Sequence, residues 1–508
     1  MSRRTVNVEL NRVEGDLAIE VDLEDGRVVD ARCVGTLYRG LEQIMTGRPA
    51  FDALVIAPRV CGICNTAHLY AAALALEHAW QVEVPPLATL VRDLGLMTEA
   101  VQSDLRQTFL FFTPDFVHPR YGTHPLAPAM QSAFAPFRGA FHLETIARTR
   151  KLIEILGLYA GQWPHSSWIV PGGITGRPDE TKRIGAEAAL DDVTRWFEAD
   201  VLGGPLDAWL ELATAAQSDA WLDARPASGL ALLTRMARAI GLDKAGVGTA
   251  DFLSFGSGFH AGEWSPPYSG RPCRLPAGTL AVAGGIAAAL DPLAIEEQVR
   301  HAWYAGQDGS QHPSTGGTVP NYPGSAEKYS WVKAPRYRGR VMQTGALSVL
   351  AVAGDPLIAA LLAAGGDNVW LRQFARLRRV GDHLRQMRLQ LRDIRAAQGQ
   401  SFINQVRPDH DGDGDGQGLI EAARGALGHW ISVRGGRIAR YQIISPTTWN
   451  ASPRDDADRP GHWEQTLIGT TIEDPDDPIE VGHIVRAHDP CFVCAVHVTE
   501  LDRQRRRG

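Results

Sequence analysis

The 508-residue sequence predicts an α+β fold that is mostly helical. From Phe51 onward, long segments rich in Ala, Leu and Arg repeat their apolar residues at helical intervals. Short runs with β-type alternation lie before residue 30 and after Asp409, so small sheets are expected near both ends. No internal repeat or clear linker divides the chain, and we expect one compact domain over residues 1–497 followed by a C-terminal tail at 498–508.

The N-terminal segment predicts a small β-meander. Residues 5–29 alternate apolar and polar side chains, and Asp25-Gly26 is typical of a hairpin turn. The sequence Arg12-Val13-Glu14-Gly15 is expected at one of the turns.

The central part predicts long amphipathic helices, with one tract of loops. The tract is residues 251–337, which is rich in Gly, Pro, Ser and Trp and indicates loops and short strands. An interruption is expected near Gly365-Gly366-Asp367. The expected helices are residues 70–80, 87–112, 136–159, 179–201, 207–216 and 357–397.

Composition excludes several classes of protein. Apolar residues make up 44% of the chain and charged residues 21%, which is enough for a sizeable buried core. The net charge of -7 gives no electrostatic footprint for nucleic acid and no polybasic membrane patch. No run of 18 uninterrupted apolar residues and no signal peptide are found. From the charge we therefore expect no nucleic-acid binding, and from the lack of a long apolar run we expect no direct membrane insertion.

Four of the six cysteines form two equally spaced pairs, Cys61-Gly62-Ile63-Cys64 and Cys491-Phe492-Val493-Cys494. Two thiolates at this spacing can hold one metal ion from a single turn, so two pairs supply four sulfur ligands. A structural zinc site is the main alternative, although its pairs usually lie about 15–20 residues apart. Here 426 residues lie between the pairs. Structural disulfides and a thioredoxin-like redox pair are less favoured.

The residues around both pairs resemble the two signature motifs of the nickel–iron hydrogenase large subunit. Arg59-Val60 precedes the first pair and His68 follows it, while Asp489-Pro490 precedes the second pair and His497 follows it. Four further segments match the family in the same order: Arg12-Val13-Glu14-Gly15, Arg39-Gly40-Leu41-Glu42, Glu421-Ala422-Ala423-Arg424-Gly425 and Pro446-Thr447-Thr448-Trp449-Asn450. The resemblance implies the fold of that subunit, with a long-helix bundle as its core.

In this family, four cysteines hold a nickel–iron centre whose iron carries carbon monoxide and two cyanides. The resemblance implies that Cys61 and Cys491 are terminal nickel ligands and that Cys64 and Cys494 bridge to the iron. Soft thiolates suit nickel through its redox changes. The implied reaction is the reversible heterolytic cleavage of H2, in which Cys491 accepts the proton and Glu14 carries it onward.

The resemblance also assigns the surroundings of this centre. Arg424 is expected over the open side of the metals, held by the carboxylates of Asp489 and Asp115. Thr447 is expected to hydrogen-bond one cyanide, and His68 a bridging sulfur.

Taken without the family, several of these residues have ordinary structural explanations. Glu14 reads as a turn carboxylate facing water, and Asp115 as a loop aspartate after a helix. Thr447 reads as a β-strand threonine, with Pro446-Thr447-Thr448-Trp449 as a strand end, and His68 as a helix-cap residue.

A second metal site is implied near the C-terminus. Glu42, His497 and a backbone carbonyl near Ile443 correspond to ligands of a buried magnesium-type ion. Two positions depart from the family pattern. Ala423 replaces a common proline, which loosens the backbone before the arginine, and Asp16 replaces a common histidine, which adds a negative charge.

One acidic run resembles a calcium loop without completing it. Residues 410–416 read His-Asp-Gly-Asp-Gly-Asp-Gly, but the closing glutamate is absent from the required position. We therefore expect a flexible acidic loop.

The cysteine count and the tail imply partners. Four motif cysteines cannot also house a chain of iron–sulfur clusters, so the resemblance implies an iron–sulfur small subunit that takes the electrons. Residues 498–508 resemble the tail that a maturation protease removes after His497, once chaperones have inserted nickel. We expect H2 oxidation; the alternatives are a hydrogen-sensing regulatory homologue with low turnover and a relative that has lost nickel. The expected location is cytoplasmic, or membrane-associated or periplasmic through the small subunit.

Overall fold

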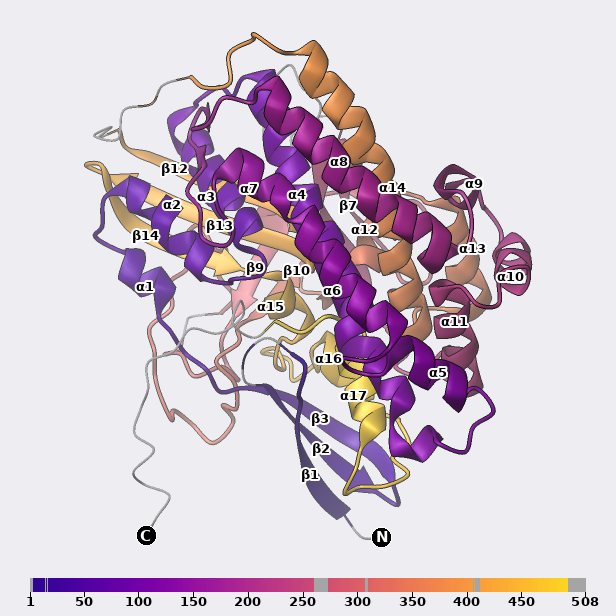
Figure 1. Cartoon of the computed structure of the whole chain (residues 1–508). Helices are drawn as coiled ribbons and strands as arrows, with labels where there is room; N and C mark the ends of the chain where they lie inside the picture. Colours follow the sequence, from indigo (N-terminus) through magenta and orange to yellow (C-terminus); the bar gives the residue numbers. More distant parts are fainter. Residues whose placement is uncertain are drawn as a thin grey trace.

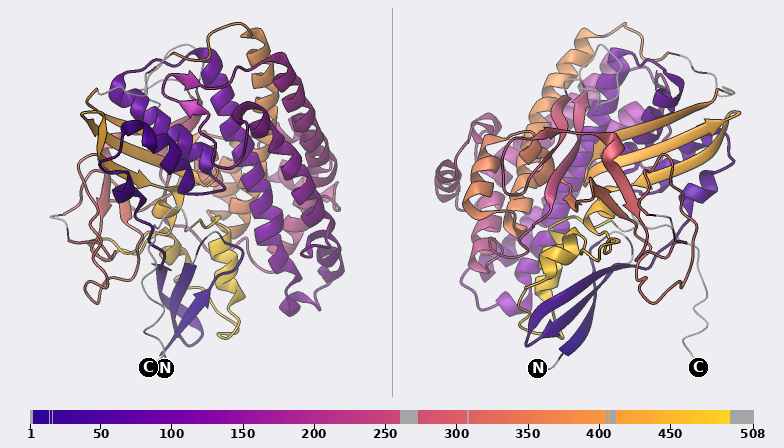
Figure 2. Two further views of the ribbon diagram at one scale, coloured as in Figure 1. Left: turned by 60° about the vertical axis from the view of Figure 1, so that its left-hand side comes forward. Right: turned by 180° about the vertical axis from the view of Figure 1, so that it is seen from behind.

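The computed structural model describes residues 3–13, 15, 17–259, 273–306, 309–404, 406 and 412–491. Long helices run side by side along one flank, a three-stranded sheet covered by further helices forms the other, and a second three-stranded sheet extends from one end (Figure 1). The two further views in Figure 2 show the same separation of helices and sheets. The predicted α+β, mostly helical fold is confirmed.

Four long helices make the bundle: α4 (Pro86–Arg106), α6 (Ala140–Leu152), α8 (Glu180–Trp196) and α14 (Val369–Ala396). Helix α14 packs against α4 and α8, and α6 packs against the same two helices. The predicted break before α14 is confirmed, because α13 (Pro356–Gly365) ends there and the Asn368 side chain accepts a hydrogen bond from the Leu371 amide to start the next helix.

Shorter helices cover the bundle ends and the sheets. The segment predicted as one helix over 207–216 is broken between α9 (Leu206–Leu210) and α10 (Ala215–Asp223), where the Thr214 side chain caps a new helix. The remaining helices are α1 (Leu41–Met45), α2 (Ala53–Ile56), α3 (Asn65–Trp80), α5 (Ala127–Phe134), α7 (Glu154–Ala160), α9 (Leu206–Leu210), α10 (Ala215–Asp223), α11 (Gly229–Ala239), α12 (Ala346–Val352), α15 (Pro446–Asn450), α16 (His462–Leu467) and α17 (Ile479–Arg486).

The N-terminal meander is confirmed as β1 (Arg3–Glu9), β2 (Leu17–Glu24) and β3 (Arg27–Gly35), with Asp25-Gly26 in the second turn. A similar antiparallel sheet near the C-terminus consists of β12 (Gly414–Ala422), β13 (Gly425–Arg434) and β14 (Arg437–Ile444). The central tract adds β6 (Asp251–Phe259), β7 (Cys273–Leu280), β8 (Ala288–Ala289) and β11 (Met342–Gln343) in one sheet and β9 (Ile295–Gln298) with β10 (Ala334–Tyr337) in another, and β4 (Ile169–Val170) pairs with β5 (Gly173–Ile174).

The Asp-Gly run expected to be a flexible loop has another role in its described part. Gly414 begins β12, and this strand packs directly on α3. A Cβ atom at Gly416 would lie 1.9 Å from the carbonyl oxygen of Ala75, and one at Gly418 would lie 2.0 Å from that of Ala71. Alternate glycines therefore face alanines one helical turn apart, and only glycine permits so close an approach of strand and helix.

Among the described residues, no helix is by itself long and apolar enough to cross a membrane, while α12 and α13 reach that composition only as a pair bent by 110°.

Candidate metal centre

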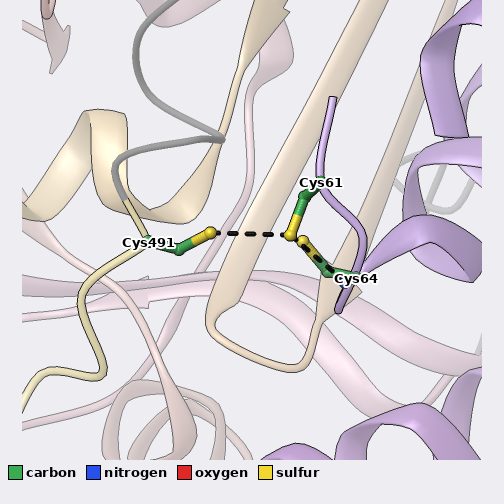
Figure 3. Close-up of side chains that lie close together, drawn as sticks. All are labelled: Cys61, Cys64 and Cys491. Atoms are coloured by element: carbon green, nitrogen blue, oxygen red, sulfur yellow. Dashed lines mark hydrogen bonds between the residues drawn. The ribbon is translucent and has the colours of Figure 1, made fainter. Parts of the chain in front are cut away.

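Cys61, Cys64 and Cys491 meet in the interior, and together they form the three-cysteine site. Their Sγ atoms all lie within 4.8 Å of one another, and the Sγ atoms of Cys61 and Cys491 are 3.5 Å apart although 430 positions separate them (Figure 3). All three side chains are buried. A compact group of thiols shielded from water fits a soft, thiolate-binding metal better than a hard cation.

The segment with the first two cysteines is fixed from both sides. The guanidinium of Arg39 donates to the carbonyl oxygens of Arg59, at 2.9 Å, and of Val60, so it holds the chain just before Cys61. Cys64 is the N-cap of α3, and its amide lies 3.3 Å from the Cys61 sulfur. The helix thus begins at the site itself.

Glu99 of α4 caps the exposed amides at this helix start. Its carboxylate accepts hydrogen bonds from the amides of Thr66, at 2.8 Å, and Ala67, at 3.1 Å. An acidic group at a helix N-terminus satisfies backbone donors that have no partner within the helix. The role of Glu99 was not predicted, because nothing in the local sequence distinguishes it from a solvent-facing glutamate.

The third cysteine comes from the segment after α17. Its amide donates to Thr447 Oγ1 at 3.2 Å, so the α15 hydroxyl anchors the Cys491 backbone. The interpretation of Pro446-Thr447-Thr448-Trp449 as a strand end was wrong, because these residues form α15 directly after β14.

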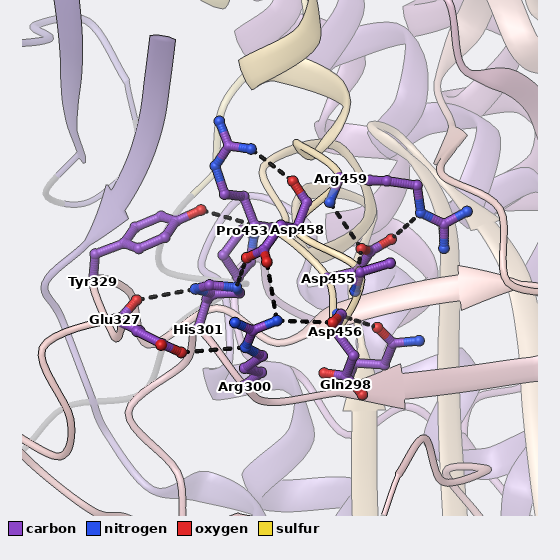
Figure 4. Close-up of polar contacts among 12 residues, drawn as sticks. Gln298, Arg300, His301, Glu327, Tyr329, Pro453, Asp455, Asp456, Asp458 and Arg459 are labelled. Carbon is purple, nitrogen blue, oxygen red and sulfur yellow. Dashed lines mark hydrogen bonds and ion pairs between the residues drawn. The ribbon is translucent and has the colours of Figure 1, made fainter.

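The chain between α15 and α16 is held by a polar network (Figure 4). Arg300 donates to the carbonyl oxygen of Asp456 at 2.9 Å, and the ring of His301 contacts Asp458 at 3.0 Å. Gln298 accepts from the Asp456 amide at 2.8 Å. These contacts attach the helices that lead to Cys491 to the strand β9 region.

Arg424 and Asp489 form a buried ion pair beside the thiols. The guanidinium Nε lies 3.1 Å from Asp489 Oδ1. Burial alone would lower the pKa of Arg424, but Asp489, Cys491, Cys64 and Cys61 raise it well above its ordinary value. The guanidinium therefore remains positively charged next to the three-cysteine site.

The prediction that Asp115 holds this arginine was wrong. Asp115 binds Arg486, whose Nε is 2.8 Å from its Oδ2, and Arg12 instead. Burial raises the pKa of Asp115, but these cations outweigh burial and lower it overall. The buried carboxylate near Asp489 is Asp104 of α4, which forms a two-point contact with Arg379. Sequence reasoning missed Asp104, because that partner lies 275 positions away.

His68 lies one turn after Cys64 and is fully buried. Its Nδ1 is 2.9 Å from Nε2 of His429, whose Nδ1 is 2.7 Å from the Tyr441 hydroxyl. Burial is the main reason that its pKa is lowered to about 4, so the ring is neutral. Its Nε2 has no hydrogen-bond partner among the described residues.

Glu42 and Ile443 are also brought together. The Ile443 amide donates to the Glu42 carboxylate at 2.8 Å, and Lys333 donates to it at 3.1 Å. Lys333 also contacts the carboxylate of Glu297 at 2.6 Å. Two carboxylates thus face one ammonium, and of these three groups only Glu42 was predicted from the sequence.

Three predicted residues lie outside the described part of the chain. They are Glu14, Cys494 and His497, and their predicted roles stay predictions. Asp16, one of the two departures from the family pattern, lies outside it as well.

Comparisons with known proteins agree with this geometry. A family profile described as Nickel-dependent hydrogenase matches residues 39–120 and 233–497. The periplasmic [NiFeSe] hydrogenase large subunit of Desulfomicrobium baculatum is 28% identical and aligns over 97% of this chain and 94% of its own length. The hydrogenase-2 large chain of Escherichia coli K12 is 28% identical, over 99% and 98% of the two chains. A solved structure of the Ni-Fe-Se hydrogenase from D. vulgaris Hildenborough superimposes with a TM-score of 0.80 at 28% identity, covering 98% of this chain and all of that one.

Proposed function

Since the chain belongs to the nickel-dependent hydrogenase family and is an oxidoreductase that acts on H2, we propose that it is the catalytic large subunit of an uptake-type nickel–iron hydrogenase. Its reaction is the reversible heterolytic cleavage of H2 to protons and electrons. The observation that carries this proposal is the three-cysteine site, which brings Cys61, Cys64 and Cys491 together beside a charged guanidinium.

The proposed cofactor is a nickel–iron centre with one carbon monoxide and two cyanides on the iron. Cys61 and Cys491 are the proposed terminal nickel ligands, and Cys64 and Cys494 the proposed bridging pair. The thiol donor set suits nickel and iron, both of which accept soft ligands. When bound, this centre supplies the Lewis acidity and the redox capacity that H2 cleavage requires.

The chain's own residues are proposed to handle charge and protons. Arg424 is held by Asp489 with its positive charge toward the thiols, where it can stabilise negative charge in the buried interior. Cys491 is the proposed first proton acceptor and Glu14 the next carrier. Thr447 is the proposed partner of a cyanide, and its hydroxyl keeps a proton to donate while its oxygen accepts from the Cys491 amide.

His68 is proposed to donate a hydrogen bond from Nε2 to a bridging cysteine sulfur. Because Nδ1 of His68 contacts His429, Nε2 is the ring nitrogen that remains available to donate a hydrogen bond to a sulfur. Such a donor raises the redox potential of a thiolate-bound metal by removing electron density from sulfur.

A magnesium ion is the proposed occupant of the second site. Glu42, the Ile443 carbonyl and His497 are its proposed ligands. Glu42 and Glu297 both face the single ammonium of Lys333, and burial raises the pKa of Glu297 to about 7. A divalent cation beside these two carboxylates would favour their charged forms.

An iron–sulfur small subunit is the proposed electron acceptor. Among the described residues, the three-cysteine site is the one group of at least three His, Cys, Asp or Glu side chains found close enough together to hold a metal ion. We further propose that a maturation protease removes residues 498–508 after chaperones insert nickel. The complex is proposed to act in the cytoplasm, or at the membrane or in the periplasm through the small subunit.

Infrared spectroscopy of the complex purified from its native host tests the proposal. Metal-bound carbon monoxide and cyanide absorb where protein is almost transparent, and we expect one carbonyl band and two cyanide bands. Rapid H2-dependent dye reduction would identify an enzyme, whereas the bands with very low turnover would identify the hydrogen-sensing alternative. Absence of the bands from a chain that ends at His497 would contradict the nickel–iron assignment.

A further inference from the structure

Three buried arginines follow one face of α14. Arg372, Arg376 and Arg379 are spaced by four and three residues, so they lie on one side of the helix, and none is more than 6% exposed. Burying three guanidiniums is costly unless each finds strong partners. Their partners therefore indicate what the arginines do.

Arg379 is attached to the residue before Arg424. Its Nε and Nη2 donate to the two carboxylate oxygens of Asp104, both at 2.8 Å. Nη2 also donates to the carbonyl oxygen of Ala423. A guanidinium held at two points by a carboxylate has a fixed orientation. Asp104 of α4 and Arg379 of α14 therefore fix the Ala423 carbonyl group, and with it the peptide bond that leads into Arg424.

Arg376 makes the equivalent contact on the Asp489 side. Its Nη1 donates to the Ala487 carbonyl oxygen at 2.6 Å, two residues before Asp489. Asp489 itself has a φ of 57°, a left-handed backbone conformation that residues other than glycine rarely adopt. The contacts of the neighbouring chain must maintain this conformation. Burial lowers the pKa of Arg376 to about 10, and the carboxylates of Asp489 and Asp104, the latter 3.9 Å from Nε, oppose this shift, so the guanidinium stays charged.

The Arg424 side chain has few restraints of its own. Its ion pair with Asp489 is the one contact of its guanidinium found among the described residues, and neither its Nε nor its Nη1 makes a hydrogen bond of good geometry. Ala423 precedes it where a proline would stiffen the backbone. The aim of Arg424 therefore depends on what holds the backbone on either side.

We propose that Arg379, braced by Asp104, and Arg376 are positioning residues that fix the Arg424–Asp489 pair against the three-cysteine site. This inference rests on the proposed function. The arginines act through the Ala423 and Ala487 carbonyls and do not contact the reacting atoms. Arg379 takes over the restraint that alanine at position 423 gives up.

The test compares variants of neighbouring arginines in the loaded complex. Arg379→Met removes the contact with Ala423, and Arg379→Lys keeps a donor at that position. Arg378→Met is the matched control: Arg378 is equally buried on α14 and also binds a carboxylate, Asp355, and the carbonyl oxygen of Trp209, but on the side of α9. Asp104→Asn removes the brace while conserving its shape.

Each variant is measured for melting temperature, infrared band positions and H2 oxidation, with turnover normalised to the carbonyl band. We expect Arg379→Met and Arg378→Met to lower the melting temperature by similar amounts. Only Arg379→Met and Asp104→Asn are expected to shift the carbonyl and cyanide bands and to lower kcat at least about tenfold, equivalent to ~1.4 kcal/mol of transition-state stabilisation. Arg379→Lys should recover part of both.

Wild-type band positions and wild-type kcat per loaded site in Asp104→Asn would overturn the inference, as would equal changes in Arg379→Met and Arg378→Met. If Arg379→Met does not load, Asp104→Asn decides. Absence of the bands and of turnover from the wild-type complex would overturn the proposed function, and this inference with it.

Discussion

Replacing Gly416 by alanine tests the close contact between β12 and α3. The added Cβ would lie 1.9 Å from the carbonyl oxygen of Ala75 and 2.6 Å from the amide nitrogen of Ala79. Both are backbone atoms, which cannot rotate away, so the strand and the helix must separate along their length. Overpacking usually costs about 1–3 kcal/mol, and we expect ~3 kcal/mol or more here because no flexible side chain can absorb the clash.

The separation should also reach the metal site. Cys64 is the N-cap of α3 and His68 lies in the first turn of this helix, so a displaced helix moves both relative to Cys491. We expect Gly416→Ala to lower the melting temperature of the complex, measured at one fixed scan rate, and to lower its nickel content.

Gly157→Ala is the matched control. Nothing lies within 4 Å of a Cβ at this position of α7, so alanine should stabilise the helix by ~0.5–1 kcal/mol. If Gly416→Ala instead has the melting temperature and the nickel content of the wild type, β12 and α3 are not in contact as described.

Three other perturbations follow from the buried charges. Arg424→Lys keeps the charge but loses the planar fork and should lower kcat about tenfold, and Arg424→Met about 100-fold, in dye-linked H2 oxidation with unchanged infrared band intensity; full activity in Arg424→Met would exclude its role. Burial raises the pKa of Glu464 to about 7, above its ordinary value, so the folded state binds the extra proton and stability falls as pH rises from about 4.5 to 7, by up to ~3 kcal/mol. Glu464→Gln should flatten that pH profile of unfolding, and an unchanged slope would contradict the assignment. Glu42→Gln should remove about one divalent cation per chain in elemental analysis while leaving nickel in place; equal magnesium in both proteins would reject the proposed ligand.

Much of the fold followed from local patterns. The alternation over residues 5–29 and the Asp25-Gly26 turn predicted the first sheet, and the helical periods predicted the bundle. The break at Gly365-Gly366-Asp367 was also correct. The errors came where tertiary contacts override local preference: the Asp-Gly run became a strand because α3 offers it a surface of small residues, and the 207–216 helix was split by a capping box at Thr214.

The sequence alone determined which chemical groups are available. The paired cysteines and their flanking residues already indicated a thiolate metal site, because ligand type and spacing are local properties of the chain. The tertiary structure decided which carboxylate serves which arginine: Asp115 pairs with Arg486, and Asp104 with Arg379, 275 positions away. Local sequence does not encode such a choice, because the cost of burying a charge is offset only by partners that the completed fold brings within reach.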